Sequence, residues 1–322
     1  MVERSYYDSF GLVVDGCKQD EKCPVVLYVN FWVNRPTDCD LDFGICLPAK
    51  SEAKRLILYI PFAVDVDEVT DLWDTFISNE VAQVVYNTDL ESRLKKDGTT
   101  IRIALGRPGV PSIVDLCKLP APSCGLSVIH CFCGCVLQIE VPTVRARGGD
   151  LDTYIGFRFR IPYKPAARRA DRIAAYQETI TSPVVSHRLF ASIEVNEHRG
   201  LPPDIRHQVA RQRAEIKRAS IAVISRSKWP VNVVEGAFRA RPLESDVWES
   251  YQPKLKEGTI RRHLVPRKWL VYQWRKSRGD KMSFQFEWIR KGVNAPSLLF
   301  YLVLYFLLSI LSELLIRWVF MD

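Results

Sequence analysis

The sequence lacks the motifs by which common nucleotide-binding, hydrolytic and zinc-dependent sites are recognised. It has no Gly-x-x-x-x-Gly-Lys-Ser/Thr loop, no Gly-x-Gly-x-x-Gly fingerprint, no Gly-x-Ser-x-Gly elbow and no His-Glu-x-x-His pair. Its five histidines are scattered along the chain, and none stands beside an obvious nucleophile. No motif therefore predicts an enzyme of a known class, and no cofactor is predicted.

Features of secreted proteins are also missing. Residues 1–14 carry charges and contain no apolar stretch of the kind found in a secretory signal. The nine cysteines are an odd number without a paired framework or a Cys-x-x-Cys motif, and no Asn-x-Ser/Thr site occurs. We therefore expect reduced thiols in a cytosolic environment.

Charge is absent from residues 292–312, and this stretch is rich in Leu, Phe, Tyr, Val and Ile without a polar stripe. At the rise of an α-helix, residues 298–320 would span roughly 35 Å, enough for a hydrocarbon core of about 30 Å. A buried core helix is the alternative, but little chain follows that could cover it. The sequence predicts a transmembrane helix over residues 296–320.

Two charged residues lie near the end of this predicted span. Counted from Leu298, Glu313 lies about 22 Å and Arg317 about 28 Å along the helix, near the far interface, where long side chains reach the head groups. They are four residues apart, so they share a helix face and are spaced to pair. Trp318 suits the far interface and Trp288 the near one. The alternative is a polar contact between spans, and thus self-association.

The charge before the span predicts its orientation. Residues 254–295 hold twelve Lys or Arg, among them Arg290 and Lys291, against three acids, whereas residues 1–253 sum to zero within a net charge of +8. Basic flanks stay on the cytoplasmic side and attract anionic lipid head groups. We expect a single-pass protein with a cytoplasmic N-terminal domain. Because the basicity belongs to this collar, it does not indicate a nucleic-acid partner.

The predicted fold class is α+β, strand-rich, with a mixed or antiparallel sheet and one C-terminal transmembrane helix. The regions expected are a strand-rich α+β domain (1–165), a smaller α+β region with the basic collar (166–281), a juxtamembrane segment (282–295) and the span (296–320). Strands are predicted at 25–33, 55–64, 99–105, 126–141, 152–161, 184–195 and 220–226, with 126–141 and 152–161 as a hairpin. Helices are predicted at 69–85, 165–178 and 201–219.

A cysteine cluster is the most conspicuous local feature. Cys131, Cys133 and Cys135 alternate within the predicted strand 126–141. At the rise of a strand, Cys131 and Cys135 would lie about 13 Å apart, too far for one zinc ion with Zn–S bonds of about 2.3 Å unless Gly134 breaks the strand. Core packing is the expected role, with a metal site, redox sensing or acylation as alternatives.

An acidic stretch follows the strand predicted at 55–64. Asp65 and Asp67 form an Asp-x-Asp pair, whose hard oxygens suit Mg²⁺ or Mn²⁺ in a metal-dependent transferase. However, acidic residues at a helix start also cap the helix and complement its dipole, and Asp67 is placed to be the N-cap of the predicted helix. We expect capping, and keep these two residues as candidate catalytic groups.

Together these features indicate a domain anchored to a membrane by its C-terminal helix. We expect a non-enzymatic sensor, effector or binding module that acts at the bilayer on an unidentified cytosolic ligand or protein. A bacterial stress or antiviral response is one setting that fits. The alternative is an anchored, metal-dependent transferase that uses Asp65 and Asp67.

Overall fold

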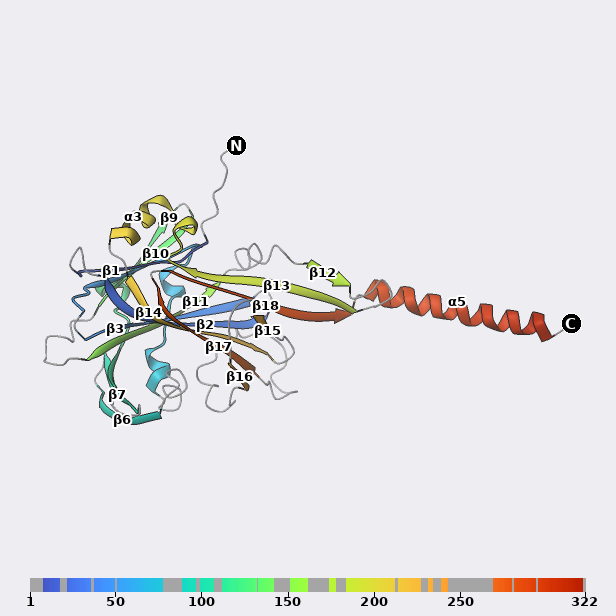
Figure 1. Cartoon of the computed structure of the whole chain (residues 1–322), viewed down its shortest axis with the longest axis horizontal. Helices are drawn as coiled ribbons and strands as arrows, with labels where there is room; N and C mark the ends of the chain where they lie inside the picture. Colours follow the sequence, from blue (N-terminus) through green and yellow to red (C-terminus); the bar gives the residue numbers. More distant parts are fainter. Residues whose placement is uncertain are drawn as a thin grey trace.

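The computed structural model describes residues 8–17, 22–35, 38–49, 51–77, 89–96, 99–106, 112–131, 133–141, 151–161, 174–177, 184–211, 214–226, 231–233, 239–242, 269–279, 281–293 and 295–320. This part of the chain forms a β-rich head from which one long helix projects (Figure 1). The predicted class, α+β with mixed sheets and one C-terminal helix, is confirmed.

The largest sheet has ten strands and runs through the centre of the head. The pairs β14–β2 and β11–β8 are parallel and the others antiparallel, so the sheet is mixed. In spatial order its strands are β16 (Arg239–Pro242), β17 (Trp269–Gly279), β14 (Ala214–Arg226), β2 (Cys23–Arg35), β3 (Asp38–Leu47), β11 (Asp152–Ile161), β8 (Ser112–Cys117), β7 (Thr100–Gly106) and β6 (Asp89–Lys96), with β5 (Thr70–Asp71) beside β11.

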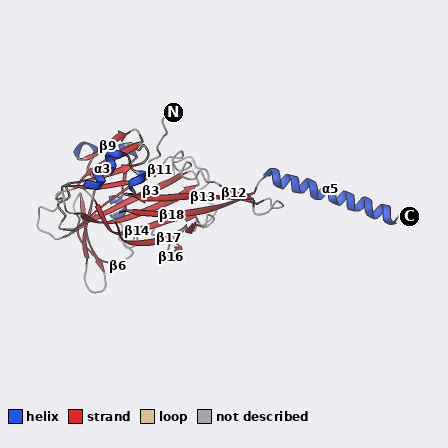
Figure 2. Ribbon diagram, turned by 45° about the horizontal axis from the view of Figure 1, so that its top comes forward, coloured by secondary structure: helices blue, strands red, loops and turns tan. Residues whose placement is uncertain are grey.

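Two four-stranded sheets complete the head. The first has the order β1 (Gly11–Asp15), β4 (Arg55–Ile60), β10 (Gly134–Glu140) and β9 (Leu126–Cys131). The second has the order β12 (Ala174–Gln177), β13 (Val184–Val195), β18 (Met282–Val293) and β15 (Val231–Val233). Strands β13 and β18 extend from the head toward α5 (Ala295–Phe320), as Figures 1 and 2 show.

The main core lies between the large sheet and the smaller ones, and strand alternation builds it. In β2, Val25, Leu27, Val29, Phe31 and Val33 all face this core, where they join apolar side chains of β4, β10 and β18. The intervening aromatic residues of β2 belong to a second cluster on the opposite face of the large sheet. Both faces of β2 are therefore buried, which explains its nearly continuous apolar sequence.

Helix α3 (Pro203–Arg211) covers the outer face of the first small sheet. Ile205 and Val209 lie four residues apart on the helix and pack against Val13 and Tyr59. The helix predicted at 201–219 is thus correct only in its first half, because β14 begins at Ala214. There the period changes to two, and the apolar residues of β14 pair with β2.

The predicted helix at 69–85 is wrong over its described part. The chain instead forms the 3₁₀ turn η1 (Val66–Glu68), the short strand β5 and the 3₁₀ turn η2 (Trp73–Ile77); residues 78–88 lie outside the description. The apolar residues recur at helical spacing, but they do not form one helix face. Val69 packs in the main core, whereas Trp73 packs in the cluster on the other face of the large sheet. One segment serves two cores as it crosses between sheets.

The single strand predicted at 126–141 is also wrong, since β9 and β10 form an antiparallel hairpin. Gly134 lies just after the turn, where a Cβ atom would strike the carbonyl oxygen of Ile60 and crowd the backbone nitrogen of Phe62. The strand predicted at 152–161 is β11, but it pairs with β3 and β8 in the large sheet and not with 126–141.

Strands from both sides of residue 165 share the large sheet, because β14 pairs with β2. The regions predicted as 1–165 and 166–281 are thus joined by one hydrogen-bonded sheet. The stretch predicted as juxtamembrane, 282–295, supplies β18, which pairs with β13 along its whole length and buries Phe284 and Phe286. Of the helix predicted at 165–178, only 174–177 is described, as strand β12.

Candidate functional site

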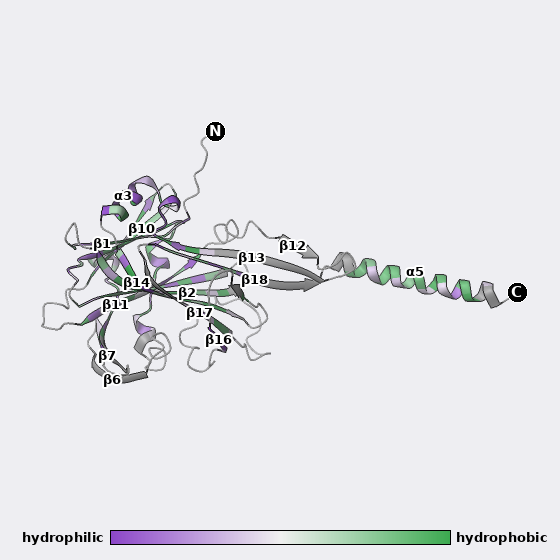
Figure 3. Ribbon diagram, in the orientation of Figure 1, coloured by the Kyte–Doolittle hydropathy of each residue, from purple (hydrophilic) through white to green (hydrophobic). Residues whose placement is uncertain are grey.

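Helix α5 is the most distinctive candidate site because its apolar residues pack against no other part of the chain that the structure describes. Residues 298–316 have a mean hydropathy of 2.3, and none of this window is buried in the protein. In Figure 3, where the ribbon is coloured by hydropathy, hydrophobic residues recur along the described turns of this helix. Sixteen large hydrophobic side chains of α5 are exposed, by 40–76%. At about 1.5–3 kcal/mol per fully buried side chain, moving them from water into hydrocarbon would gain on the order of 20 kcal/mol.

The dimensions and polar groups of α5 suit a bilayer. Its 26 residues correspond to about 39 Å. The Ser312 hydroxyl donates to the carbonyl oxygen of Ser309 at 2.7 Å, so this polar group is satisfied within the helix. Glu313 and Trp318 are exposed on the helix. The pairing of Glu313 with Arg317 stays a prediction, because the Arg317 side chain is outside the described part.

The predicted basic collar is not a single belt in the structure. Arg290 and Lys291 lie at the end of β18 that leads into α5, together with Trp288. Lys281 lies before the opposite end of β18, about 40 Å away at the rise of a strand. Residues 275–278 lie near that far end too, and 243–268 are outside the described residues. The interfacial roles of Trp288, Arg290 and Lys291 stay predictions.

A hollow of about 450 Å³ lies between η1 and the edge strand β9. Its walls include Asp65 and Asp67 on one side and Leu126, Val128 and His130 on the other. His130 Nε2 lies 3.2 Å from Asp65 Oδ1, and both side chains are more than half exposed. The structure thus brings the two predicted carboxylates to one solvent-filled surface site.

The geometry favours a capping role at Asp65, not Asp67. Asp65 precedes η1, its backbone N–H donates to Glu68 Oε2 at 3.1 Å, and its carbonyl accepts from the Glu68 N–H at 3.0 Å. Among the described residues no group of three or more His, Cys, Asp or Glu is arranged to hold a metal ion. The transferase alternative thus gains no support from the arrangement of these side chains.

The β9–β10 hairpin separates the three clustered cysteines. Cys135 is fully buried and its thiol donates to the carbonyl oxygen of Phe62 at 3.3 Å, while Cys133 is half-buried in the turn and Cys131 is exposed. Burial raises the pKa of Cys135 to about 11. The core role expected for the cluster therefore describes Cys135, whereas Cys131 is an accessible thiol.

A second hollow, of about 530 Å³, lies at the end of the β13–β18 pair that is farther from α5. Its lining includes Glu197 and Lys281, whose carboxylate oxygen and ammonium nitrogen are 2.9 Å apart. This hydrogen bond from Lys281 lowers the pKa of Glu197. The Lys281 side chain is exposed and that of Glu197 is half-buried, and the pair links the β17–β18 connection to the segment after β13.

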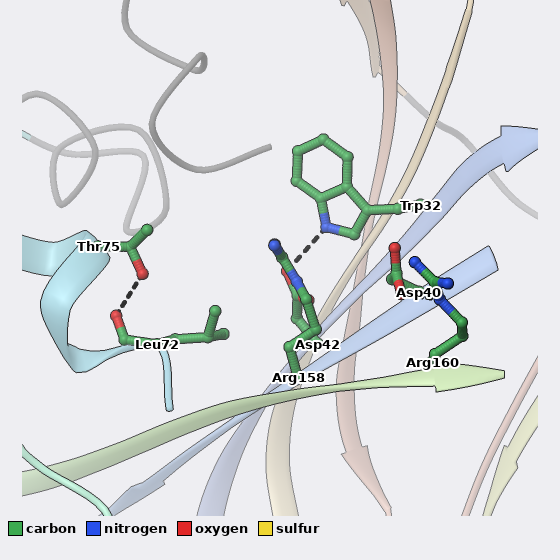
Figure 4. A network of polar contacts seen from close by, with 7 residues as sticks. All are labelled: Trp32, Asp40, Asp42, Leu72, Thr75, Arg158 and Arg160. Atoms are coloured by element: carbon green, nitrogen blue, oxygen red, sulfur yellow. Dashed lines mark hydrogen bonds and ion pairs between the residues drawn. The ribbon is translucent and has the colours of Figure 1, made fainter. Parts of the chain in front are cut away.

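Sequence reasoning missed a ladder of charges on the large sheet, in which Asp40, Asp42 and Arg158 are buried and Arg160 is partly exposed (Figure 4). Arg158 on β11 is paired directly with Asp42 on β3, and Arg160 with Asp40. Arg158 donates to Asp42 through Nε at 2.5 Å and Nη2 at 3.0 Å, and Trp32 Nε1 donates to Asp42 at 2.8 Å. The Arg158 guanidinium also lies 5.3 Å from the centre of the Trp32 ring. Asp42 is thus held by three donors.

The signal for this ladder is present in the sequence. Alternating aspartates in "DCDLD" and alternating arginines in "FRFR" each place charges on one face of a strand. Directly opposed residues of opposite charge stabilise a strand pair, so the two patterns match β3 and β11. The opposed charges match in the observed register of β3 and β11 and so favour that register. Because Asp42 and Arg158 are buried, we interpret their role as structural.

No protein-family model matches this chain, and no curated protein matches its sequence. The proposal below therefore depends on the physical chemistry of the chain.

Proposed function

We propose that this protein is a single-pass membrane protein whose β-rich head is held at the cytoplasmic face of a bilayer and works there as a non-enzymatic binding module. The exposed apolar helix α5 carries the proposal. A soluble protein rarely exposes an apolar surface of this size, and a bilayer removes it from water.

The connection between head and helix supports a role at the bilayer. One residue separates β18 from α5, and β18 pairs with β13 over its full length. The head is thus tethered by a two-stranded ribbon and not by a long linker. A ligand that shifts the head would act on the span through this ribbon, and oligomers formed through α5 would hold their heads together.

Charge and thiol chemistry support the cytoplasmic orientation. Arg290 and Lys291 directly precede the span, as expected for a flank that stays in the cytoplasm near anionic lipids. All nine cysteines lie before residue 136, and those the structure describes are free. Free thiols suit a reducing compartment.

Native cysteines provide a test of this orientation without new labels. Cys124 and Cys131 are exposed on the head, and α5 contains no cysteine. In intact cells, a membrane-impermeant maleimide should leave the protein unlabelled, and permeabilisation of the plasma membrane should allow labelling. A variant with both residues changed to serine is the matched control. Labelling of both thiols in intact cells would contradict the cytoplasmic orientation.

A further inference from the structure

Strand β9 is an unusually accessible sheet edge. The other described edges carry features that discourage pairing with another chain. β6 contains five charged residues and two register irregularities. β16 contains arginines and a proline, and β12 and β15 are very short. β9 has the sequence "LSVIHC", without Lys, Arg, Pro, Gly or a bulge in its pairing with β10.

The opposite edge of the same sheet shows how an edge is closed. The backbone N–H of Leu12 on β1 donates to Asn196 Oδ1 at 2.7 Å, and the N–H of Phe10 donates to the carbonyl oxygen of Glu194 at 2.8 Å. Helix α3 also contacts β1. The turns η1 and η3 (Pro122–Cys124) contact β9, but among the described residues no backbone group outside β10 bonds to the N–H or C=O groups of Val128 and His130.

The hydrogen-bond pattern identifies the open groups of β9. The N–H of Glu140 donates to the carbonyl oxygen of Gly125 at 2.9 Å, which fixes the alternation of the β9–β10 ladder. Ser127 and Ile129 then bond to β10, whereas the backbone N–H and C=O groups of Val128 and His130 point away from it. An added strand would find four backbone groups in the spacing of a β-ladder.

The two faces of this edge differ in chemistry. On one face lies the 450 Å³ hollow with the exposed carboxylates of Asp65 and Asp67. On the other face lies Ile129, which is 50% exposed and is the one large apolar side chain so exposed among the described residues outside α5. Alternate side chains of an added strand would thus face the negative charges of the hollow, and the side chains between them would face the apolar surface at Ile129.

We propose that the β9 edge binds an extended peptide that alternates basic with apolar residues and adds to the sheet as a fifth strand. Backbone pairing supplies affinity, and the alternating side chains supply specificity. The proposal rests on the binding role of the head and not on its attachment to a membrane.

Charge decides against a second copy of this chain as the occupant. Antiparallel pairing of β9 with β9 would bring two sets of Asp65, Asp67 and Glu68 toward one edge, and like charges in such positions repel. A basic peptide instead neutralises these carboxylates. The partner is therefore a basic, extended segment of another protein.

Three eight-residue probes test the proposal by fluorescence anisotropy with the full chain in a non-ionic detergent, where anionic lipid is absent. The first alternates lysine with valine. The second replaces lysine with glutamate. The third is the lysine peptide with N-methyl groups on the amides of every second residue, and it is made in two forms, one methylated at the lysines and one at the valines. We expect saturable binding of the first peptide and of the N-methylated peptide whose methyl groups lie on the strand edge away from β9, because alternate amides of a strand point to opposite edges. The second peptide has the wrong charge, and the N-methylated peptide of the other register cannot pair.

Two variants locate the site. Asp65→Asn with Asp67→Asn should weaken binding about tenfold, because two solvent-exposed ion pairs with the peptide are lost. The control Glu52→Gln with Asp204→Asn makes the same charge change at exposed sites elsewhere and should leave binding unchanged. Val128→Pro removes one outward N–H and should also weaken binding, with the circular dichroism spectrum confirming the fold.

Each result bears on the proposal separately from the membrane assignment. Equal binding of the lysine and glutamate peptides, or equal binding of the two N-methylated peptides, would overturn it. Equal loss in the Asp65/Asp67 variant and its control would place the peptide elsewhere on the surface and overturn it too. Absence of peptide binding, or a dimer that forms through β9 and excludes the peptide, would also refute it, while the cysteine-labelling result would stand unaffected.

Discussion

The buried ladder offers a sharp test of the fold. Asp42 is 2% exposed, and its carboxylate accepts two hydrogen bonds from Arg158 and one from Trp32. Asp42→Asn keeps the shape but removes the charge and replaces one acceptor oxygen with an NH₂ donor that would face other donors. Arg158, 9% exposed, would lose its carboxylate partner in a poorly solvated site.

Breaking a buried ion pair by removal of one partner costs about 3–5 kcal/mol, a large part of the roughly 5–15 kcal/mol that stabilises a typical domain. The control is Glu197→Gln, which breaks the surface pair with the exposed Lys281 and should cost less than about 1 kcal/mol. Replacing both partners, as Asp42→Leu with Arg158→Met, should cost less than Asp42→Asn, since no charge remains buried.

The assay is urea unfolding of the full chain in a non-ionic detergent, followed by tryptophan fluorescence. Trp32 is fully buried beside Asp42 and is one of the eight tryptophans whose summed emission follows unfolding. Asp42→Asn should lower the unfolding midpoint far more than Glu197→Gln. If the two variants lose the same small amount of stability, the ladder is not a buried ion pair and the β3–β11 register is incorrect.

Three further predictions concern the head. Iodoacetamide should modify exposed Cys131 well before Cys135, whose pKa is raised to about 11 by burial; mass spectrometry of the native protein that finds Cys135 modified first would contradict the hairpin. Gly134→Ala should cost about 1–3 kcal/mol in urea unfolding, because its Cβ would strike the Ile60 carbonyl, whereas the control Gly279→Ala should cost less; equal losses would refute the close approach. The pKa of Glu197 is lowered in the folded protein, so its ion pair stabilises the fold fully above the ordinary pKa of 4.5 and loses this effect as the pH falls through the lower folded value. Glu197→Gln should therefore flatten the dependence of the urea midpoint on pH in this acidic range. An unchanged pH profile in the variant would contradict the role of the ion pair.

Local patterns in the sequence predicted the elements whose environment is uniform. The apolar run before residue 320 predicts α5, and the β-branched and aromatic residues of 25–33 and 184–195 predict β2 and β13. In such segments every turn or every face meets the same kind of surroundings, so composition alone is sufficient.

Predictions failed where distant segments decide the structure. The break before Gly134 depends on the backbone of Ile60, and the segment after Asp65 reads as a helix because it serves two cores in succession. The parallel pairing of β14 with β2 joins residues about 190 positions apart, which no local pattern specifies. The candidate pair Asp65 and Asp67 was found from sequence, but the β9 edge beside it depends on sheet order.

The central claim is that α5 crosses a bilayer, and alkaline carbonate extraction followed by flotation tests it most directly. The full chain should float with membranes, and a chain ending at Val293, which keeps β18, should remain soluble. Leu304→Lys with Leu308→Lys should lose insertion at a cost of about 5–7 kcal/mol, while alanines at both positions should preserve it. Release of the full chain by carbonate, or flotation of the lysine variant to the same extent, would contradict the membrane assignment.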